Sequence, residues 1–208
     1  MAKKPGLKTA YGLDGVEDVK ALYRDWAESY DDGFAEARGY DLHRIVAEGY
    51  HAAGGEGPVL DVGAGTGLVG EVLAKLGIGP VDGTDISPEM LEVAAAKGCY
   101  ARTFVADITQ PTAVFDDTYC GIVSAGTFTL GHLGPGPIAE LIRITRPGGL
   151  VALTINAQHW EEAGFESAIR QLGDLVADVQ RRSVQIYAAS ADHDHAADIG
   201  YLTLLRVL

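Results

Sequence analysis

The chain has 208 residues, with 29 acidic side chains against 16 basic ones and a formal net charge of −13 at pH 7. This length suits one domain with a substantial core. The acidic excess disfavours a nucleic-acid partner, because such proteins neutralise phosphates with Lys and Arg. No apolar run reaches the roughly 18 residues that a membrane span needs, and no apolar segment follows the basic start as it would in a signal peptide.

The cysteines indicate a reducing environment. Cys99 and Cys120 form neither a close pair nor a metal-binding spacing. Cys120 falls in an expected core strand, where a thiol behaves as a small hydrophobic group. We therefore expect a cytoplasmic protein. The run Asp-His-Asp-His at 192–195 resembles a metal-binding run, but a polar loop explains it, so we expect no metal site.

Two amphipathic helices are expected ahead of the first strand, over residues 16–30 and 42–50. In the first, Tyr23, Trp26 and Tyr30 recur at i, i+3 and i+7, which makes one helical stripe. This stripe either packs on a sheet or covers a ligand. In the second helix we expect His43 on the exposed surface.

Residues 59–67, VLDVGAGTG, carry the strongest signal in the sequence. A short apolar strand ends in Asp61, and the glycines at 63, 65 and 67 let the backbone turn sharply and approach a ligand closely. The negative charge of Asp61 favours an ammonium or sulfonium group and repels a pyrophosphate. S-adenosylmethionine carries both positive groups and no phosphate. However, residues 65–70 also fit the G-x-G-x-x-G dinucleotide fingerprint, so an NAD(P)-dependent oxidoreductase is an alternative.

A second strand over 81–86 places Asp85 about 20 residues beyond the glycines, where an acid binds ribose hydroxyls in nucleoside-binding α/β folds. A solvated loop acid is the alternative reading of Asp85. Ser87 then serves as the N-cap of a helix, with Pro88 at its first position.

Later segments continue the alternation of strands and helices. A third strand at 103–105 leads to Asp107, which can accept from an adenine amino group or cap a helix instead, and to Ile108, which offers a main-chain N–H and an apolar edge. Further strands are expected at 120–123, 150–155, 176–187 and 201–207, and helices at 138–145 and 160–172. The breaker-rich residues 146–149 are expected to form a turn. Five βα units and an antiparallel strand pair result.

Four segments, in this order and spacing, resemble the class I S-adenosylmethionine-dependent methyltransferases: residues 60–67, 83–87, 106–108 and 146–150. The resemblance implies an α/β fold, a Rossmann-like doubly wound seven-stranded sheet that is mostly parallel with an antiparallel last strand. It also implies N-terminal lid helices in residues 1–53 and a cofactor-binding core in residues 57–208.

Residues 22–31, LYRDWAESYD, resemble the opening of small-molecule methyltransferases and of the methyltransferase-like group named for the Williams–Beuren region. The resemblance favours a lid there, with Tyr30 near the methionine end of the cofactor. The expected cofactor-binding residues are Tyr30, Asp61, Gly63, Ala64, Gly65, Gly67, Asp85, Ile86, Met90, Asp107, Ile108 and Ser124.

The implied reaction moves the methyl group of S-adenosylmethionine to a nucleophilic O, N, S or C, with S-adenosylhomocysteine as product. The protein must hold that atom in line with the methyl carbon at roughly 3 Å and exclude water. If a general base is used, His132 is the best candidate; a loop histidine with no role is the alternative, and His159 lies on the same side.

The acceptor is expected to be a small molecule. The segment after the fourth strand, SAGTF, differs from the Asp/Asn-Pro-Pro-aromatic motif of DNA amino-methylating enzymes, and Tyr119 rather than Pro precedes Cys120. We therefore expect no nucleic-acid or membrane partner, and a monomer or homodimer. A non-catalytic S-adenosylmethionine-binding protein is the second alternative.

Overall fold

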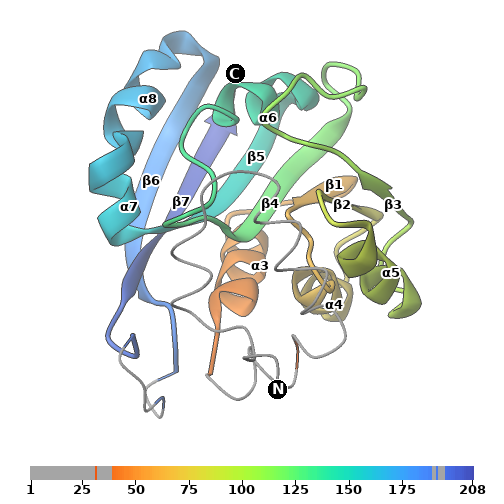
Figure 1. Ribbon diagram of the computed structural model, residues 1–208. Helices are drawn as coiled ribbons and strands as arrows, with labels where there is room; N and C mark the ends of the chain where they lie inside the picture. The colour runs from red at the N-terminus through yellow and green to blue at the C-terminus, as the bar shows by residue number, and fades with distance from the viewer. Residues whose placement is uncertain (1–30, 32–38, 189–190, 192–194) are drawn as a thin grey trace.

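The computed structural model describes residues 31, 39–188, 191 and 195–208, and within them one seven-stranded sheet lies between two layers of helices (Figure 1). This confirms the predicted Rossmann-like fold. The helix expected over 16–30, with Tyr30, lies outside the described residues, as do residues 192–194 of the Asp-His-Asp-His run. None of the described helices is long and apolar enough to cross a membrane.

The strands lie in the order β3-β2-β1-β4-β5-β7-β6, and β7 runs antiparallel to both of its neighbours. Strands β1 to β5 are parallel, so their carboxyl ends meet at one edge. The order reverses between β1 and β4, which is where open α/β sheets form a binding crevice. The strands are β1 Val59–Val62, β2 Val81–Asp85, β3 Arg102–Val105, β4 Tyr119–Phe128, β5 Thr145–Asn156, β6 Val176–Gln185 and β7 Ile199–Val207.

Alternate side chains of a strand point to opposite faces of the sheet. Because the strands carry apolar side chains on both faces, helices cover both faces. Val59 and Val123 pack with α3 and α4, whereas Leu60 and Ile122 pack with α6, α7 and α8. The helices are α3 Leu42–Ala52, α4 Leu68–Lys75, α5 Pro88–Ala96, α6 Ile138–Ile144, α7 Ala157–Ala163 and α8 Phe165–Gln171, with a 3-10 turn η3 Gly173–Leu175.

Helix α3 is a layer of the core. Val46, Ala47 and Tyr50 are fully buried, and the Tyr50 hydroxyl donates to the Glu56 carbonyl at 2.7 Å. The opposite end of α3 begins at the carboxyl edge of the sheet, so this helix connects the core to the binding crevice.

Three local predictions are wrong. The helix expected over 160–172 is divided into α7 and α8, because Gly164 adopts a left-handed φ of 73° that ends α7. The connection from β3 to β4 contains no helix, so there are fewer than five βα units. Residues 146–149, expected to form a turn, lie within β5. The pairing of β5 with β4 shifts there from Tyr119–Thr145 to Gly121–Leu150, so the extra residues of β5 form a bulge.

Candidate functional site

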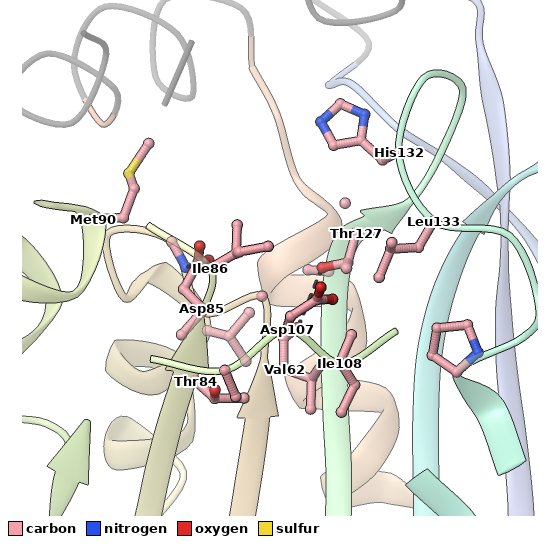
Figure 2. A pocket seen from close by; sticks show the side chains of 18 of the residues that line it. Val62, Thr84, Asp85, Ile86, Met90, Asp107, Ile108, Thr127, His132 and Leu133 are labelled. Atoms are coloured by element: carbon pink, nitrogen blue, oxygen red, sulfur yellow. Dashed lines mark hydrogen bonds between the residues drawn. The ribbon is translucent and has the colours of Figure 1, made fainter. Parts of the chain in front are cut away.

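A cavity of about 640 Å³ opens at the carboxyl edge of the sheet, at the crevice between β1 and β4. Residues from β1, β2, α3, the segment after β3, and the β4–α6 loop line it. Figure 2 shows Asp85, Ile86 and Met90 toward one end of the cavity and His132 and Leu133 toward the other. The cavity size is typical of a small-molecule site.

The structure brings most of the predicted site residues together at this cavity. Eight of the predicted cofactor-binding residues line it, together with His132. Those eight are Gly63, Ala64, Gly65, Asp85, Ile86, Met90, Asp107 and Ile108. Asp61, Gly67 and Ser124 do not line the cavity, and Tyr30 lies outside the described residues.

In the glycine loop, a neighbouring side chain fills the space beside Gly63, whereas the space beside Gly65 is open. A Cβ on Gly63 would stand 2.1 Å from Thr127 Oγ1, so glycine is needed where the ends of β1 and β4 meet. Gly65 has a left-handed φ of 53°, and a Cβ there would meet nothing within 4 Å. The open space beside Gly65 belongs to the cavity, so its backbone is available for close approach by a ligand.

Asp85 braces this loop. Its Oδ2 accepts from the Gly65 N–H at 2.8 Å, and its Oδ1 accepts from the Ser87 N–H at 2.9 Å. Burial raises the pKa of Asp85, and these hydrogen bonds oppose the rise. A carboxylate has about four lone-pair positions, so each oxygen retains one for a ligand. The predicted N-cap is confirmed, because Ser87 Oγ accepts from the Met90 N–H at 3.2 Å.

Asp107 forms a local turn at the cavity wall. Its Oδ1 accepts from both the N–H and the hydroxyl of Thr109, at 2.9 and 2.6 Å. Ile108 beside it is buried and belongs to the core cluster that includes α6. The turn therefore fixes one carboxylate oxygen and holds Ile108 against the cavity.

The three residues away from the cavity lie in the layer beneath it. Asp61 is fully buried, and its Oδ2 accepts from the Tyr100 hydroxyl at 2.7 Å. Gly67 begins α4 with a φ of 94°, and a Cβ there would stand 3.0 Å from the Tyr100 ring. Ser124 Oγ donates to the Val62 carbonyl at 2.7 Å and so joins β4 to β1.

His132 lines the cavity from the β4–α6 loop. Its Nδ1 lies 3.1 Å from the Leu130 carbonyl, which only accepts, so the neutral ring carries its hydrogen on Nδ1. Burial lowers the pKa of His132, which keeps the ring neutral near pH 7. His159 does not line the cavity. Its Nε2 lies 2.9 Å from the Leu133 carbonyl and so supports the same loop from α7.

The exposed position expected for His43 is wrong, because this residue lines the cavity from the first turn of α3. Its ring stacks on Tyr40 with centroids 5.9 Å apart. Burial lowers the pKa of His43, and its buried Nδ1 has no hydrogen-bond partner among the described residues. A sequence signal existed: His43 stands at i, with Val46, Ala47 and Tyr50 of the buried stripe at i+3, i+4 and i+7.

Residues 59–149 match a protein family described as a methyltransferase domain. The chain is 33% identical to human methyltransferase-like protein 27 over 153 residues, covering 71% of this chain and 62% of that protein. It is 32% identical to the malonyl-[acyl-carrier protein] O-methyltransferase of Serratia marcescens, covering 70% of this chain and 56% of that protein. The chain thus spans less than two thirds of either relative.

The fold is shared with a solved structure of a TehB-like SAM-dependent methyltransferase from Corynebacterium glutamicum. The TM-score is 0.64 at 21% sequence identity, and the match covers 90% of this chain and 99% of the other. The segment matched by the family contains the glycine loop and Asp85 and Asp107, the two acidic side chains among the described residues that line the cavity.

Proposed function

Because this chain belongs to the class I S-adenosylmethionine-dependent methyltransferases, we propose that it moves the methyl group of S-adenosylmethionine to a nucleophilic atom of a small molecule. The family implies this cofactor, and S-adenosylhomocysteine is the corresponding product. The observation that carries the proposal is the hydrogen bond from the Gly65 N–H to Asp85.

That hydrogen bond occupies a backbone N–H that a dinucleotide pyrophosphate needs at a glycine loop. At the start of α4, Asp85 accepts from the Gly65 N–H and Asp31 accepts from the Thr66 hydroxyl. Asp31 and Glu71, in the first turn of α4, both pair with Lys97, so neither is an uncompensated charge. None of the described residues that line the cavity is Lys or Arg. The occupied Gly65 N–H and a described lining that contains Asp85 and Asp107 but no Lys or Arg both oppose a pyrophosphate, so they support S-adenosylmethionine over NAD(P).

The nucleoside end of the cofactor fits the acidic half of the cavity. Asp85 would accept from the ribose hydroxyls through its remaining lone pairs, while it keeps the loop in place. Asp107 and the Ile108 N–H would bind the adenine edge. Asp61 would contribute negative charge from beneath the loop, because a buried charge is weakly screened.

The acceptor would occupy the other half of the cavity, beside His132 and Leu133. S-adenosylmethionine, when bound, supplies a methyl group on a sulfonium that is a good leaving group. The chain's task is to orient the nucleophile in line with that methyl group and to exclude water. His132 would accept the proton that an OH or NH acceptor loses. A small acceptor suits a cavity of about 640 Å³ that would also hold the cofactor.

A cytoplasmic location is part of this proposal, since Cys99 and Cys120 are both free thiols.

Calorimetry with S-adenosylhomocysteine and with NADH tests the cofactor first. We expect S-adenosylhomocysteine to bind and NADH not to bind; the reverse result would support the oxidoreductase alternative. A screen of small acceptors with radiolabelled S-adenosylmethionine then tests transfer. Binding of cofactor without transfer to any acceptor would instead favour a non-catalytic binding protein.

A further inference from the structure

Tyr100 sits in a slot made by three glycines. It lies between α5 and β3, and its ring reaches back over β2 to the start of α4. Added Cβ atoms on Gly67 and Gly83 would each stand 3.0 Å from the ring, and one on Gly70 would stand 2.5 Å from Cζ. Two glycines of the G-x-G-x-x-G pattern, Gly67 and Gly70, therefore leave space for Tyr100 rather than for a ligand.

The Tyr100 hydroxyl makes two hydrogen bonds at the end of this slot. It donates to Asp61 Oδ2 at 2.7 Å and accepts from the Gly70 N–H at 3.3 Å. Gly70 is the third residue of α4, so its N–H has no partner within the helix. A single hydroxyl therefore joins the acid of β1 to the beginning of the helix that follows the glycine loop.

Asp61 is directly beneath the cavity. It pairs with Gly83 in the sheet register and precedes Val62 and Gly63, which line the cavity. Its Oδ1 is buried and has no hydrogen-bond partner among the described residues, and no described Lys or Arg forms an ion pair with Asp61. A buried carboxylate in this state is stabilised by a cation nearby.

We propose that Tyr100 is a positioning residue for the cofactor, which holds Asp61 as a carboxylate toward the cationic methionine end of S-adenosylmethionine. This inference rests on the proposed function. Tyr100 does not touch the cofactor: it acts through Asp61 and through the N-terminus of α4.

The protonation of Asp61 then couples cofactor affinity to pH. Burial raises the pKa of Asp61 to about 7, the Tyr100 hydrogen bond lowers it, and the negative charge of Asp85 raises it. Cys99 and Tyr100 are the other titratable groups close to Asp61 in the described chain. Burial raises the pKa of Tyr100, so its hydroxyl remains a donor at neutral pH. A cationic ligand prefers the carboxylate, so its affinity should rise as the pH passes upward through about 7.

Tyr100→Phe tests this proposal, because phenylalanine still fills the glycine slot. Without the donor the pKa of Asp61 should rise by about one to two units, so at pH 7 S-adenosylhomocysteine should bind about five- to fifty-fold more weakly. Calorimetry between about pH 6 and about pH 8 should show the rise in affinity displaced to higher pH. Tyr119→Phe is the matched control, since it removes a similar hydrogen bond, to Asp82 at 2.8 Å, away from the cavity.

A second ligand separates positioning from a purely structural role. 5′-Methylthioadenosine has the nucleoside but not the amino-acid end, so Tyr100→Phe should leave its affinity nearly unchanged. An equal loss for both ligands, or a pH profile like that of the wild type, would overturn the inference.

Asp61→Asn provides an independent check, even if Tyr100→Phe does not fold. The amide cannot titrate, so the change in affinity near pH 7 should disappear, and its persistence would overturn the inference. If the wild type binds no S-adenosylhomocysteine at any pH, the proposed function itself is overturned, and this inference with it.

Discussion

At the scale of single residues, Asp85 has two tasks, and a sequence pattern does not distinguish them. Each of its oxygens accepts a backbone N–H, from Gly65 and from Ser87, and the residue lines the cavity. The acid thus fixes the glycine loop and, in the proposed function, binds the ribose. Substitutions at Asp85 therefore need a comparison that separates the two tasks.

Asp85→Ala should weaken S-adenosylhomocysteine binding by roughly ten- to a hundredfold, because charge-assisted hydrogen bonds are worth about 1.5–3 kcal/mol. Asp85→Asn keeps one acceptor oxygen and should lose less. Calorimetry on both folded variants measures the difference. If neither variant changes the affinity, Asp85 is not a cofactor ligand.

Gly65 allows a sharper test, because its missing Cβ faces the cavity. Gly65→Ala should weaken cofactor binding by on the order of a hundredfold, since the methyl group would occupy space that the adenosyl group needs. Alanine at this left-handed φ should also lower the free energy of unfolding by roughly 1–2 kcal/mol.

Gly77→Ala is the matched control for that strain. Gly77 has a left-handed φ of 73° and open space at its Cβ, but it does not line the cavity. We expect a similar loss of stability in chemical denaturation and unchanged cofactor binding. Equal binding by both alanine variants would show that the loop is only a connection.

At the scale of elements, the β3–β4 connection is held by α6 instead of by a helix of its own. Glu140 Oε1 accepts from the N–H and the hydroxyl of Thr112, both at 2.8 Å. Arg143 binds Glu140 and the Val114 carbonyl, and it also pairs with Asp116. The segment that presents Asp107 and Ile108 to the cavity is thereby attached to α6.

Glu140→Gln should lower the free energy of unfolding at neutral pH by about 1–2 kcal/mol. The hydrogen bond from Arg143 lowers the pKa of Glu140 from 4.5 to about 2, so its stabilisation is complete above pH 4.5 and is lost as the pH falls toward 2. Urea denaturation should therefore show the wild type and the variant converging across that range.

The control for this prediction is Glu166→Gln, which removes an exposed ion pair with Arg170 on α8. Exposed pairs contribute little, so its stability should stay close to that of the wild type at every pH. A constant difference between wild type and Glu140→Gln down to about pH 2 would contradict the role assigned to Glu140.

At the scale of the whole molecule, the cavity gathers histidines from distant parts of the chain. His43 comes from α3, and His132 comes from the β4–α6 loop, yet both line the same cavity. Burial lowers the pKa of each, so both rings are neutral near pH 7. Two neutral imidazoles thus share the cavity with two acidic residues, Asp85 and Asp107.

His132→Gln should reduce the rate of methyl transfer by about 10²- to 10⁴-fold and leave S-adenosylhomocysteine affinity nearly unchanged. The wild-type rate should fall on the acid side of the pKa of His132, because a protonated ring cannot accept a proton. Since burial lowers that pKa, the fall should begin below the ordinary value of 6.5. His51→Gln, on the exposed end of α3, is the control. An unchanged transfer rate in His132→Gln would remove it as the base.

The sequence by itself determined the succession of the core strands and part of the cavity wall. The positions of Gly65, Asp85, Ser87 and Asp107 follow local rules: backbone conformation, strand ends and helix capping. Such rules depend on neighbours in the chain, so a linear pattern contains them.

Only the tertiary structure decided what contacts Asp61, Gly67, Gly70 and His43. The Tyr100 hydroxyl is 39 positions from Asp61 in the sequence, and the two meet because β1 pairs with β2 in the sheet and α4 packs against these strands. The sequence does not distinguish a glycine that leaves space for an aromatic ring from one that leaves space for a ligand. The direction of a side chain is set by the packing of distant elements, and for that reason the glycine pattern could be recognised before its occupant was known.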